Sequence, residues 1–132
     1  MRVSRTARYA LLVVAHLASD PCPHSAERLS SEAGVPASYI PKVVAPLLRS
    51  GVLDSQRGFG GGYILVADPH RLTAQDVIEA IDGPGRSMDL RDATGGAVDR
   101  VIEAAVDQAR SSLAGWSIAR LAAILQENDN HY

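Results

Sequence analysis

The sequence predicts a mainly α-helical fold with one small β-hairpin, and three observations carry this prediction. Apolar residues recur at spacings of three and four along several segments, as on the buried face of a helix. Two short helical segments flank Gly34-Val35-Pro36, which is the sequence form of a helix-turn-helix. A glycine-rich stretch then separates two short alternating segments, as in a hairpin. Together they predict a winged helix-turn-helix domain followed by a long C-terminal helix.

The first two helices have clear ends. An apolar stripe predicts a helix over Ser4–Ala18, and the run Asp20-Pro21-Cys22-Pro23 ends it. Ser25 has the side chain of a good N-cap for a second helix over residues 26–33. Gly34 suits the left-handed position that follows a helix C-terminus, so the second helix is expected to end there.

The third helix, which follows Pro36 and runs to about Ser50, is the predicted recognition element. Pro41 fits only if this helix begins near Ser38, because proline is tolerated in the first turn. Pro46 lies in the interior, where it removes a backbone hydrogen bond and costs about 3 kcal/mol in an ideal helix. We therefore predict a recognition helix that is bent or locally broken in its first half.

The glycine-rich stretch predicts the tip of a wing. It joins the predicted strands Leu53–Gln56 and Tyr63–Val66 and reads Arg57-Gly58-Phe59-Gly60-Gly61-Gly62-Tyr63. A dinucleotide-binding turn would need glycine where Tyr63 stands, and the lysine and hydroxyl of a nucleoside-triphosphate loop are missing. A purely structural hairpin stays open as an alternative. Arg57 favours a DNA-contacting wing, because arginine can enter a narrow minor groove.

The C-terminal part is divided by glycines and by polar segments. A capping-box-like start at Thr73 predicts a helix that ends at Gly83, and a polar loop is expected over 83–96. A helix over 97–114 should follow, and then a short helix from Ser117 through Leu125 before a polar tail. We accordingly divide the chain into a winged helix-turn-helix domain (1–82), a loop (83–96) and a dimerisation helix with a short C-terminal helix (97–132).

The helix over residues 97–114 is the predicted dimerisation element. A winged domain does not need a long separate helix with an apolar face, so we expect that face to meet a second copy of the chain. Packing of the helix on its own domain is the common alternative for an amphipathic helix. The residues of the predicted dimerisation face are Val98, Val101, Ile102, Ala105, Ala109 and Leu113.

The charge is distributed unevenly along the 132 residues, which are about the size of one domain. The net charge is −2, which by itself would argue against a nucleic-acid partner. Residues 1–66, however, hold seven basic and four acidic residues, whereas residues 67–132 hold six basic and eleven acidic ones. The halves therefore carry +3 and −5, as expected when one half meets phosphates, although chance variation is the simpler alternative.

The cysteine content and the apolar segments limit the possible disulfides, metal sites and location of the protein. The single cysteine, Cys22, excludes an intrachain disulfide. Cys22 could be a redox thiol that joins two chains, a metal ligand together with His24 and His16, or a solvated turn thiol, and we assign no metal site. The apolar run Tyr9–Ala18 is too short to span a bilayer and no secretory pattern is present, so we expect a cytoplasmic protein without a membrane partner.

Several segments together resemble the Rrf-two (Rrf2, BadM-like) family of bacterial winged helix-turn-helix regulators over nearly the whole chain. The segments that carry the resemblance are Arg8-Tyr9-Ala10, the helix pair with Ser38-Tyr39, Ser50-Gly51-Val52-Leu53, the wing Arg57–Tyr63, Thr73 through Gly83-Pro84, and Ser117–Leu121. The resemblance implies a homodimer that regulates promoters, with the long helix crossing its mate. It also implies that Ser38, Tyr39, Lys42 and Arg57 meet DNA, and that Arg2 and Arg5 contact phosphate.

The chain departs from the family pattern at three places. Phe59 replaces the usual wing proline, and Pro41 stands where many relatives carry a polar base-reading residue. Cluster-sensing members of the family carry three cysteines in the loop that corresponds to residues 83–96, and this loop has none. Because an iron–sulfur cluster needs several thiolate or imidazole ligands, we expect no cluster and no other cofactor.

The sequence thus predicts a sequence-specific DNA-binding transcriptional regulator, which we expect to repress as a homodimer on an inverted repeat. The predicted DNA-binding residues are Arg2, Arg5, Ser38, Tyr39, Lys42, Arg57, Gly58, Phe59, Gly60, Gly61 and Tyr63. The alternative is a protein-interaction module of the same fold that has lost DNA reading, as Pro41 and Pro46 would suggest. An enzyme is not expected, because no nucleophile–base pair or metal-ligand set stands out. The effector or protein partner is not indicated.

Overall fold

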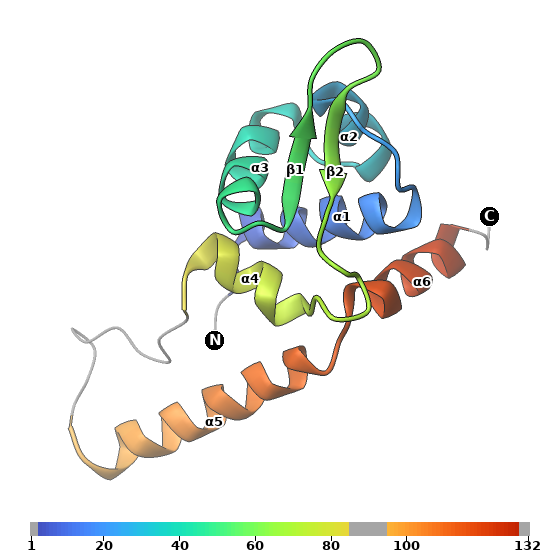
Figure 1. Ribbon diagram of the computed structural model, residues 1–132. Helices are drawn as coiled ribbons and strands as arrows, with labels where there is room; N and C mark the ends of the chain where they lie inside the picture. Colours follow the sequence, from blue (N-terminus) through green and yellow to red (C-terminus); the bar gives the residue numbers. More distant parts are fainter. Residues whose placement is uncertain (1–2, 85–94, 130–132) are drawn as a thin grey trace.

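The computed structural model describes residues 3–84 and 95–129 and shows a mostly helical chain with one two-stranded hairpin (Figure 1). This confirms the predicted fold class. In chain order the elements are α1 (Arg5–Ser19), α2 (Ala26–Ala33), the 3-10 turn η1 (Ala37–Tyr39), α3 (Ile40–Arg49), β1 (Leu53–Gln56), β2 (Gly62–Leu65), α4 (Ala74–Asp82), α5 (Ala97–Ala114) and α6 (Ile118–Asp129).

The first two helices begin and end on the capping residues that the sequence offers. The Ser4 side chain accepts a hydrogen bond from the Ala7 amide at the start of α1, and the Ser25 side chain does the same for the Arg28 amide in α2. Gly34 follows α2 with a φ of +73°, the left-handed conformation that glycine adopts without a Cβ penalty. The buried face of α1 carries the predicted stripe, and its buried residues are Ala7, Ala10, Val13, Val14, Ala15 and Leu17.

The recognition segment is divided, as the prolines predict. Ala37–Tyr39 form a separate 3-10 turn, and the α-helix begins only at Ile40 with Pro41 in its first turn, where its missing N–H costs nothing. Pro46 lies inside α3 and cannot donate to the Lys42 carbonyl one turn earlier. The segment therefore has the locally broken first half that the sequence predicts.

The hairpin pairs its strands antiparallel, from Leu53 opposite Leu65 to Gln56 opposite Gly62. The second strand begins one residue earlier than expected, because Gly62 already pairs with Gln56 and Val66 lies beyond the ladder. The Val66 amide instead donates to the Val52 carbonyl at 3.0 Å, which leads the chain away from the sheet.

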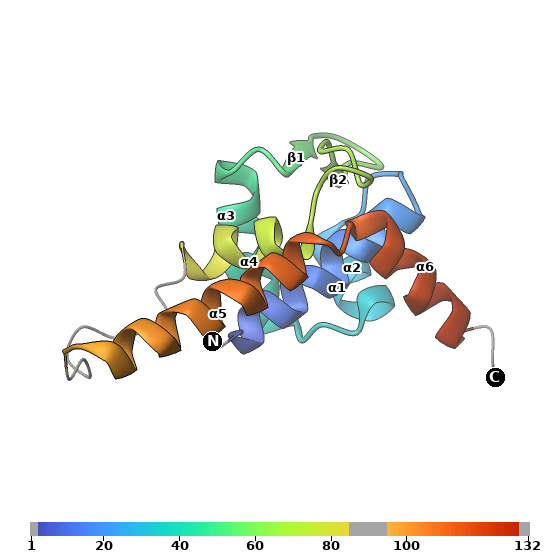
Figure 2. The same cartoon turned by 90° about the horizontal axis from the view of Figure 1, so that it is seen from below.

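The last helix returns to the body of the protein. The Ile118 amide donates to the Leu72 carbonyl and the Ala74 amide donates to the Trp116 carbonyl, both at 2.8 Å. Ile118 is fully buried in the core, and α6 packs along α1, whereas α5 extends away from the body (Figures 1 and 2). The predicted end of α6 at Leu125 was wrong, since the helix continues to Asp129.

Parts of two expected segments lie outside the described residues. These are residues 85–94 of the predicted loop and residues 130–132 of the predicted polar tail. Within the residues that the structure describes, no helix has both the length and the apolar character that crossing a bilayer requires.

Gly62 is expected to tolerate no side chain at the base of the wing. A Cβ at this position would lie 2.3 Å from the carbonyl carbon and oxygen of His24, and the φ of +147° is itself unfavourable for other residues. Gly62→Ala should therefore lower the free energy of unfolding by about 2 kcal/mol or more, measured by urea denaturation. Gly60→Ala is the control: its φ is +76° but its Cβ would meet open space, so the loss should stay near 1 kcal/mol. Equal losses in both variants would show that the close approach to His24 does not matter.

Candidate nucleic-acid interface

The start of the recognition segment presents polar side chains on the surface. Ser38 lies in η1 and Lys42 in the first turn of α3, and both are exposed. The opposite side of α3 is buried in the core through Ile40, Val43, Val44 and Leu47. The helix thus holds its polar N-terminal face outward by burying its other face.

Tyr39 connects the recognition segment to α1. Its half-buried ring meets the Tyr9 ring edge-on, with 4.7 Å between centroids and 67° between planes. The Lys42 Nζ lies 5.2 Å from the centroid of the Tyr39 ring, within cation–π range. The structure therefore gives Tyr39 a packing role that positions Lys42, and a phosphate contact from Tyr39 stays a prediction.

A further basic residue lies at the start of α1. Arg5 is exposed in the first turn of α1, one turn before Tyr9, so it lies on the same end of the helix as the Tyr9–Tyr39 contact. Arg2 lies outside the described residues, so its predicted phosphate contact stays a prediction. Arg5 and Lys42 thus come from two elements that share the buried core and the Tyr9–Tyr39 contact.

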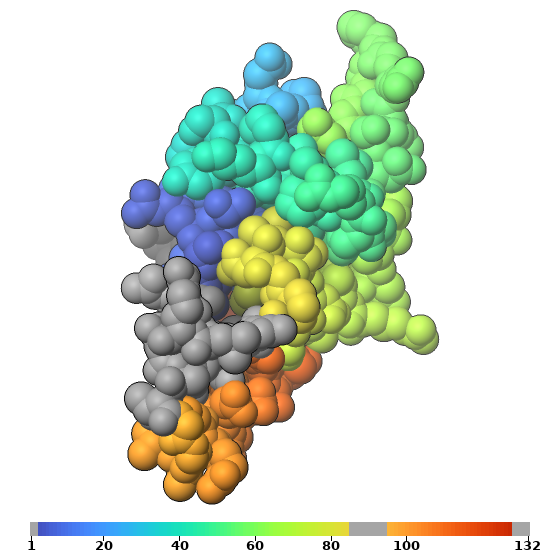
Figure 3. All heavy atoms as spheres, turned by 90° about the vertical axis from the view of Figure 1, so that its left-hand side faces the viewer, coloured from blue at the N-terminus to red at the C-terminus, as the bar shows by residue number. Residues whose placement is uncertain are grey.

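The hairpin forms a finger that projects beyond the helices, shown in green in Figure 3. Its tip is closed by the Gly61 amide, which donates to the Gly58 carbonyl at 3.0 Å. Arg57 and Phe59 are both exposed on this tip, and Phe59 is the most exposed large apolar side chain of the described residues. A basic and an aromatic side chain on a projecting turn can enter a groove or stack on a base or sugar.

The base of the wing is fastened to the turn between α1 and α2. The Tyr63 amide donates to the His24 carbonyl at 2.8 Å, and the His24 amide donates to the Tyr63 carbonyl at 3.0 Å. The Tyr63 side chain is half-buried against the core, so this residue lies at the anchored base of the wing and not at its tip. The sequence did not indicate this junction, because residues 24 and 63 are far apart in the chain and an isolated bridge has no periodicity.

Cys22 lies in the same turn and is half-buried. Its thiol donates to the Asp20 Oδ1 at 3.4 Å and accepts from the Arg28 Nη1 at 3.5 Å. Within the described parts of the chain, the side chains that could hold a metal ion are those of His16, Asp20, His24 and Glu32, and the Cys22 sulfur is not among them. His16 and His24 therefore lie close enough together to bind one metal ion, as the sequence suggested. The Cys22 sulfur does not belong to this group of ligands.

The predicted dimerisation face is largely uncovered. Val98 and Val101 expose 64% and 68% of their surface, and Ile102 exposes 43%. Ala105 and Ala109 are exposed as well, and Leu113 is half-buried nearer the body. The buried residue of α5 is Val106, which lies at the edge of this face, four residues after Ile102 and seven before Leu113.

The helix pair, the exposed recognition turn and the projecting hairpin define a winged helix-turn-helix protein. The chain belongs to the Rrf2 family, whose model carries the description iron-dependent transcriptional regulator and matches residues 3–124. The proteins to which it is similar are transcriptional regulators and not enzymes.

Two curated relatives and a solved structure illustrate the similarity. The chain is 33% identical over 86 residues to the HTH-type transcriptional regulator CymR of Bacillus subtilis, which is 64% of this chain and 62% of that protein. It is 31% identical over 94 residues to the HTH-type regulator BadM of Rhodopseudomonas palustris, which is 70% of this chain and 59% of BadM. The structure of B. subtilis CymR, the global cysteine regulator, aligns with a TM-score of 0.81 at 25% identity, covering 94% of this chain and 98% of that one.

The contact between Tyr9 and Tyr39 is expected to stabilise the start of the recognition segment. Replacing either tyrosine with leucine keeps apolar volume but removes the edge-to-face geometry. In a double-mutant cycle of Tyr9→Leu and Tyr39→Leu, the free energy of unfolding should show a coupling of about 1 kcal/mol. The control cycle pairs Tyr39→Leu with Tyr63→Leu on the wing, and it should show additive effects. Additivity in both cycles would contradict a specific contact between the two rings.

Proposed function

We propose that this chain binds double-stranded DNA as a homodimer and represses transcription from an inverted-repeat operator. The observation that carries the proposal is the pair of exposed surfaces on one rigid body: the recognition turn with Ser38 and Lys42, and the wing tip with Arg57 and Phe59. In a winged helix-turn-helix protein, the first of these enters a major groove and the second reaches a neighbouring groove.

The charges also support a DNA complex in which the recognition turn and the wing face the duplex. The N-terminal half of the sequence carries +3, and its exposed basic residues include Arg5, Lys42 and Arg57. Contacts of such residues with phosphates would supply affinity without sequence information, whereas Ser38 and Lys42 would meet base edges. The affinity should therefore depend strongly on salt.

The exposed face of α5 supports the dimer. Val98, Val101 and Ile102 form an apolar surface on a helix that extends away from its own body. Exposed apolar surface of this kind marks a protein interface more often than a solvated face. A dimer through α5 would present two recognition turns, about 34 Å apart on one side of a duplex.

We also propose that the chain regulates without an iron–sulfur cluster. The family description includes iron, but the full sequence holds one cysteine, and that thiol lies in the turn before α2. One thiolate does not fit the ligand requirement of a cluster held by several thiolate or imidazole groups. The proposal is checked by the visible spectrum and the iron and sulfide content of anaerobically purified protein.

Arg57 is expected to contribute directly to DNA binding. Bound duplexes are first selected from a randomised library, and a selected duplex is then titrated at several salt concentrations. Arg57→Ala should weaken binding about 5- to 50-fold and reduce the slope of log K against log salt by about one. Arg71→Ala makes the same charge change at an exposed site beyond the hairpin and should leave both values unchanged. If the wild-type dimer selects no sequence at all, the chain is instead an interaction module with this fold.

The α5 face is expected to hold the dimer together. Val101→Asp places a charge in the centre of the exposed apolar face, where it would be buried in a dimer without a partner. Sedimentation velocity should show a dimer for the wild type and a monomer for this variant. Ser111→Asp adds the same charge on the far side of α5 and should remain a dimer. A wild-type monomer at micromolar concentration, or a dimer in both variants, would exclude this interface.

A further inference from the structure

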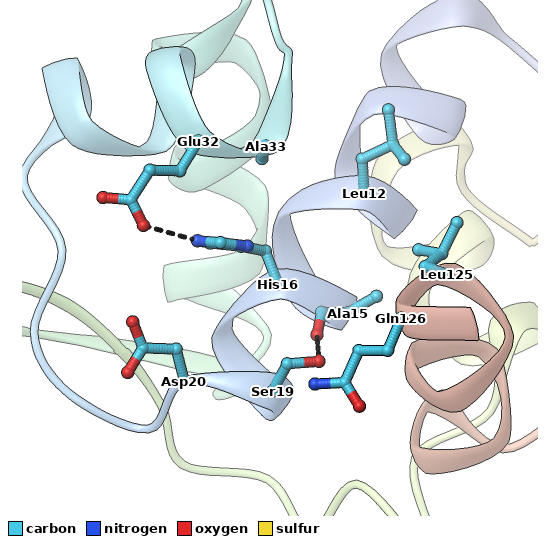
Figure 4. A pocket seen from close by; sticks show the side chains of 9 residues that line it. All are labelled: Leu12, Ala15, His16, Ser19, Asp20, Glu32, Ala33, Leu125 and Gln126. Atoms are coloured by element: carbon cyan, nitrogen blue, oxygen red, sulfur yellow. Dashed lines mark hydrogen bonds and ion pairs between the residues drawn. The ribbon is translucent and has the colours of Figure 1, made fainter. Parts of the chain in front are cut away.

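Four potential metal ligands meet where α1, α2 and the turn between them come together. His16 belongs to α1, Asp20 follows it, His24 lies in the turn, and Glu32 lies on α2. One ligand atom from each side chain lies within 4.8 Å of the other three. Figure 4 shows how His16, Asp20 and Glu32 point toward one another from these elements.

The distances within this cluster suit a small cation. The His16 Nε2 lies 3.0 Å from the Glu32 Oε1, and the His24 Nε2 lies 3.3 Å from the Asp20 Oδ2 and 3.6 Å from the Glu32 Oε1. A tetrahedral site with metal–ligand bonds of about 2.1 Å has ligand atoms about 3.4 Å apart. These three distances are thus close to the distance between two ligand atoms in a tetrahedral site.

His24 supplies an independent sign of a ligand. Its ring is completely buried, and its Nδ1 lies 2.6 Å from the Cys22 carbonyl oxygen. Since a carbonyl only accepts, Nδ1 carries a proton, and in the neutral form of the ring Nε2 would be the nitrogen with the lone pair. A metal-binding histidine is typically oriented in this way, with its other N–H donated to a carbonyl.

The free nitrogen of His24 has no hydrogen-bond partner among the described residues. Its 3.3 Å approach to Asp20 is within ion-pair distance, but the direction does not make a hydrogen bond. A neutral, buried Nε2 would point its lone pair at the oxygens of two partly exposed carboxylates, which is unfavourable. A cation at the centre of the cluster resolves this, because it accepts the nitrogen and both carboxylates as ligands.

Arg28 is the charged group that faces the same cluster from outside. It donates through Nη2 to the Asp20 Oδ2 at 3.1 Å and through Nε to the Glu32 Oε2. This contact holds the pKa of the Glu32 carboxyl below its ordinary value, so Glu32 is ionised at neutral pH. Arg28 does not contact the Glu32 Oε1, which faces the His16 Nε2 and is the oxygen that would bind a metal. It shares the Asp20 Oδ2 with His24, and its side chain is 41% exposed.

A pocket of about 400 Å³ gives access to the cluster. His16, Asp20 and Glu32 line one side of this pocket, and Leu125 and Gln126 of α6 line another (Figure 4). An ion can therefore reach the ligands from solvent, and a water molecule can complete its coordination.

We propose that His16, Asp20, His24 and Glu32 bind one divalent transition-metal ion per chain. Two imidazole nitrogens and two carboxylate oxygens form a donor set that suits borderline cations such as Zn²⁺, Co²⁺ or Fe²⁺ in preference to Mg²⁺ or Ca²⁺. Two carboxylates and one guanidinium leave a net charge of −1 around the site, which favours a dication.

The site is connected to the wing through the backbone of His24. The His24 carbonyl and amide form both hydrogen bonds to Tyr63, and Gly62 packs directly on the His24 carbonyl. An ion bound to the His24 side chain would therefore stabilise the base of the wing. An effect of the ion on DNA affinity would follow from this only if the proposed DNA-binding function holds.

The test uses the full chain, stripped of metal by a chelator and then titrated with Zn²⁺ by calorimetry and with Co²⁺ by visible absorption. One ion per chain is expected, with the intense d–d bands of a tetrahedral Co²⁺ site. His16→Gln and Glu32→Gln, which alter partly exposed side chains, should each weaken Zn²⁺ binding at least about 10-fold. Cys22→Ser and His70→Gln should bind as the wild type does, and circular dichroism verifies that all four variants are folded.

Two results would overturn the proposal. One is the absence of Zn²⁺ and Co²⁺ binding by the wild type, which would leave the cluster as a network of ion pairs around a protonated His24. The other is binding that His16→Gln and Glu32→Gln do not weaken more than the two control variants do.

The link to the wing is tested separately by hydrogen exchange: Zn²⁺ should slow exchange of the Tyr63 amide severalfold in the wild type and not in Glu32→Gln. These measurements need no DNA, so they stand apart from the test of the DNA-binding function.

Discussion

Two backbone hydrogen bonds between His24 and Tyr63 hold the wing against the helix-turn-helix. The position of the wing relative to the recognition turn depends on them. A two-stranded hairpin is only marginally stable by itself in water. Here the second strand gains a second neighbour, besides β1, from the turn before α2, with Gly62 allowing the two backbones to approach closely. The position of Arg57 relative to the recognition turn is therefore set at the base of the wing and not at its tip.

The recognition segment contains two prolines, and these residues disfavour one long helix. The 3-10 turn over Ala37–Tyr39 lets α3 begin late enough that Pro41 falls in the first turn. The edge contact of Tyr39 with Tyr9 then holds this turn against α1. The predicted break is thus a packed feature that presents Ser38 and Lys42 at a defined place, which weakens the prolines as an argument for lost DNA reading.

Local signals in the sequence were sufficient for the helices and the hairpin, and insufficient for the contacts between them. Ser25, Gly34 and Thr73 act on neighbouring residues, so their capping roles could be predicted from the chain alone, whereas Ser4 was predicted as the first helical residue and is the N-cap. The approach of residue 24 to residue 63 and the packing of α6 along α1 are long-range, and no periodicity encodes them. The same holds for Glu32, since only the fold brings it to the histidines, although the spacing of His16, Asp20 and His24 offered a partial signal.

The place of the proposed ion site determines how it could act. His24 can reach Asp20 and Glu32 only while its backbone is held in the turn, and that backbone is held by Tyr63 of the wing. A docked wing therefore favours the arrangement of ligands that a cation requires. Because coupling between two binding events is reciprocal, a cation must favour the docked wing by the same free energy. No longer pathway through the protein is needed, since one residue, His24, belongs to both the ligand set and the wing junction.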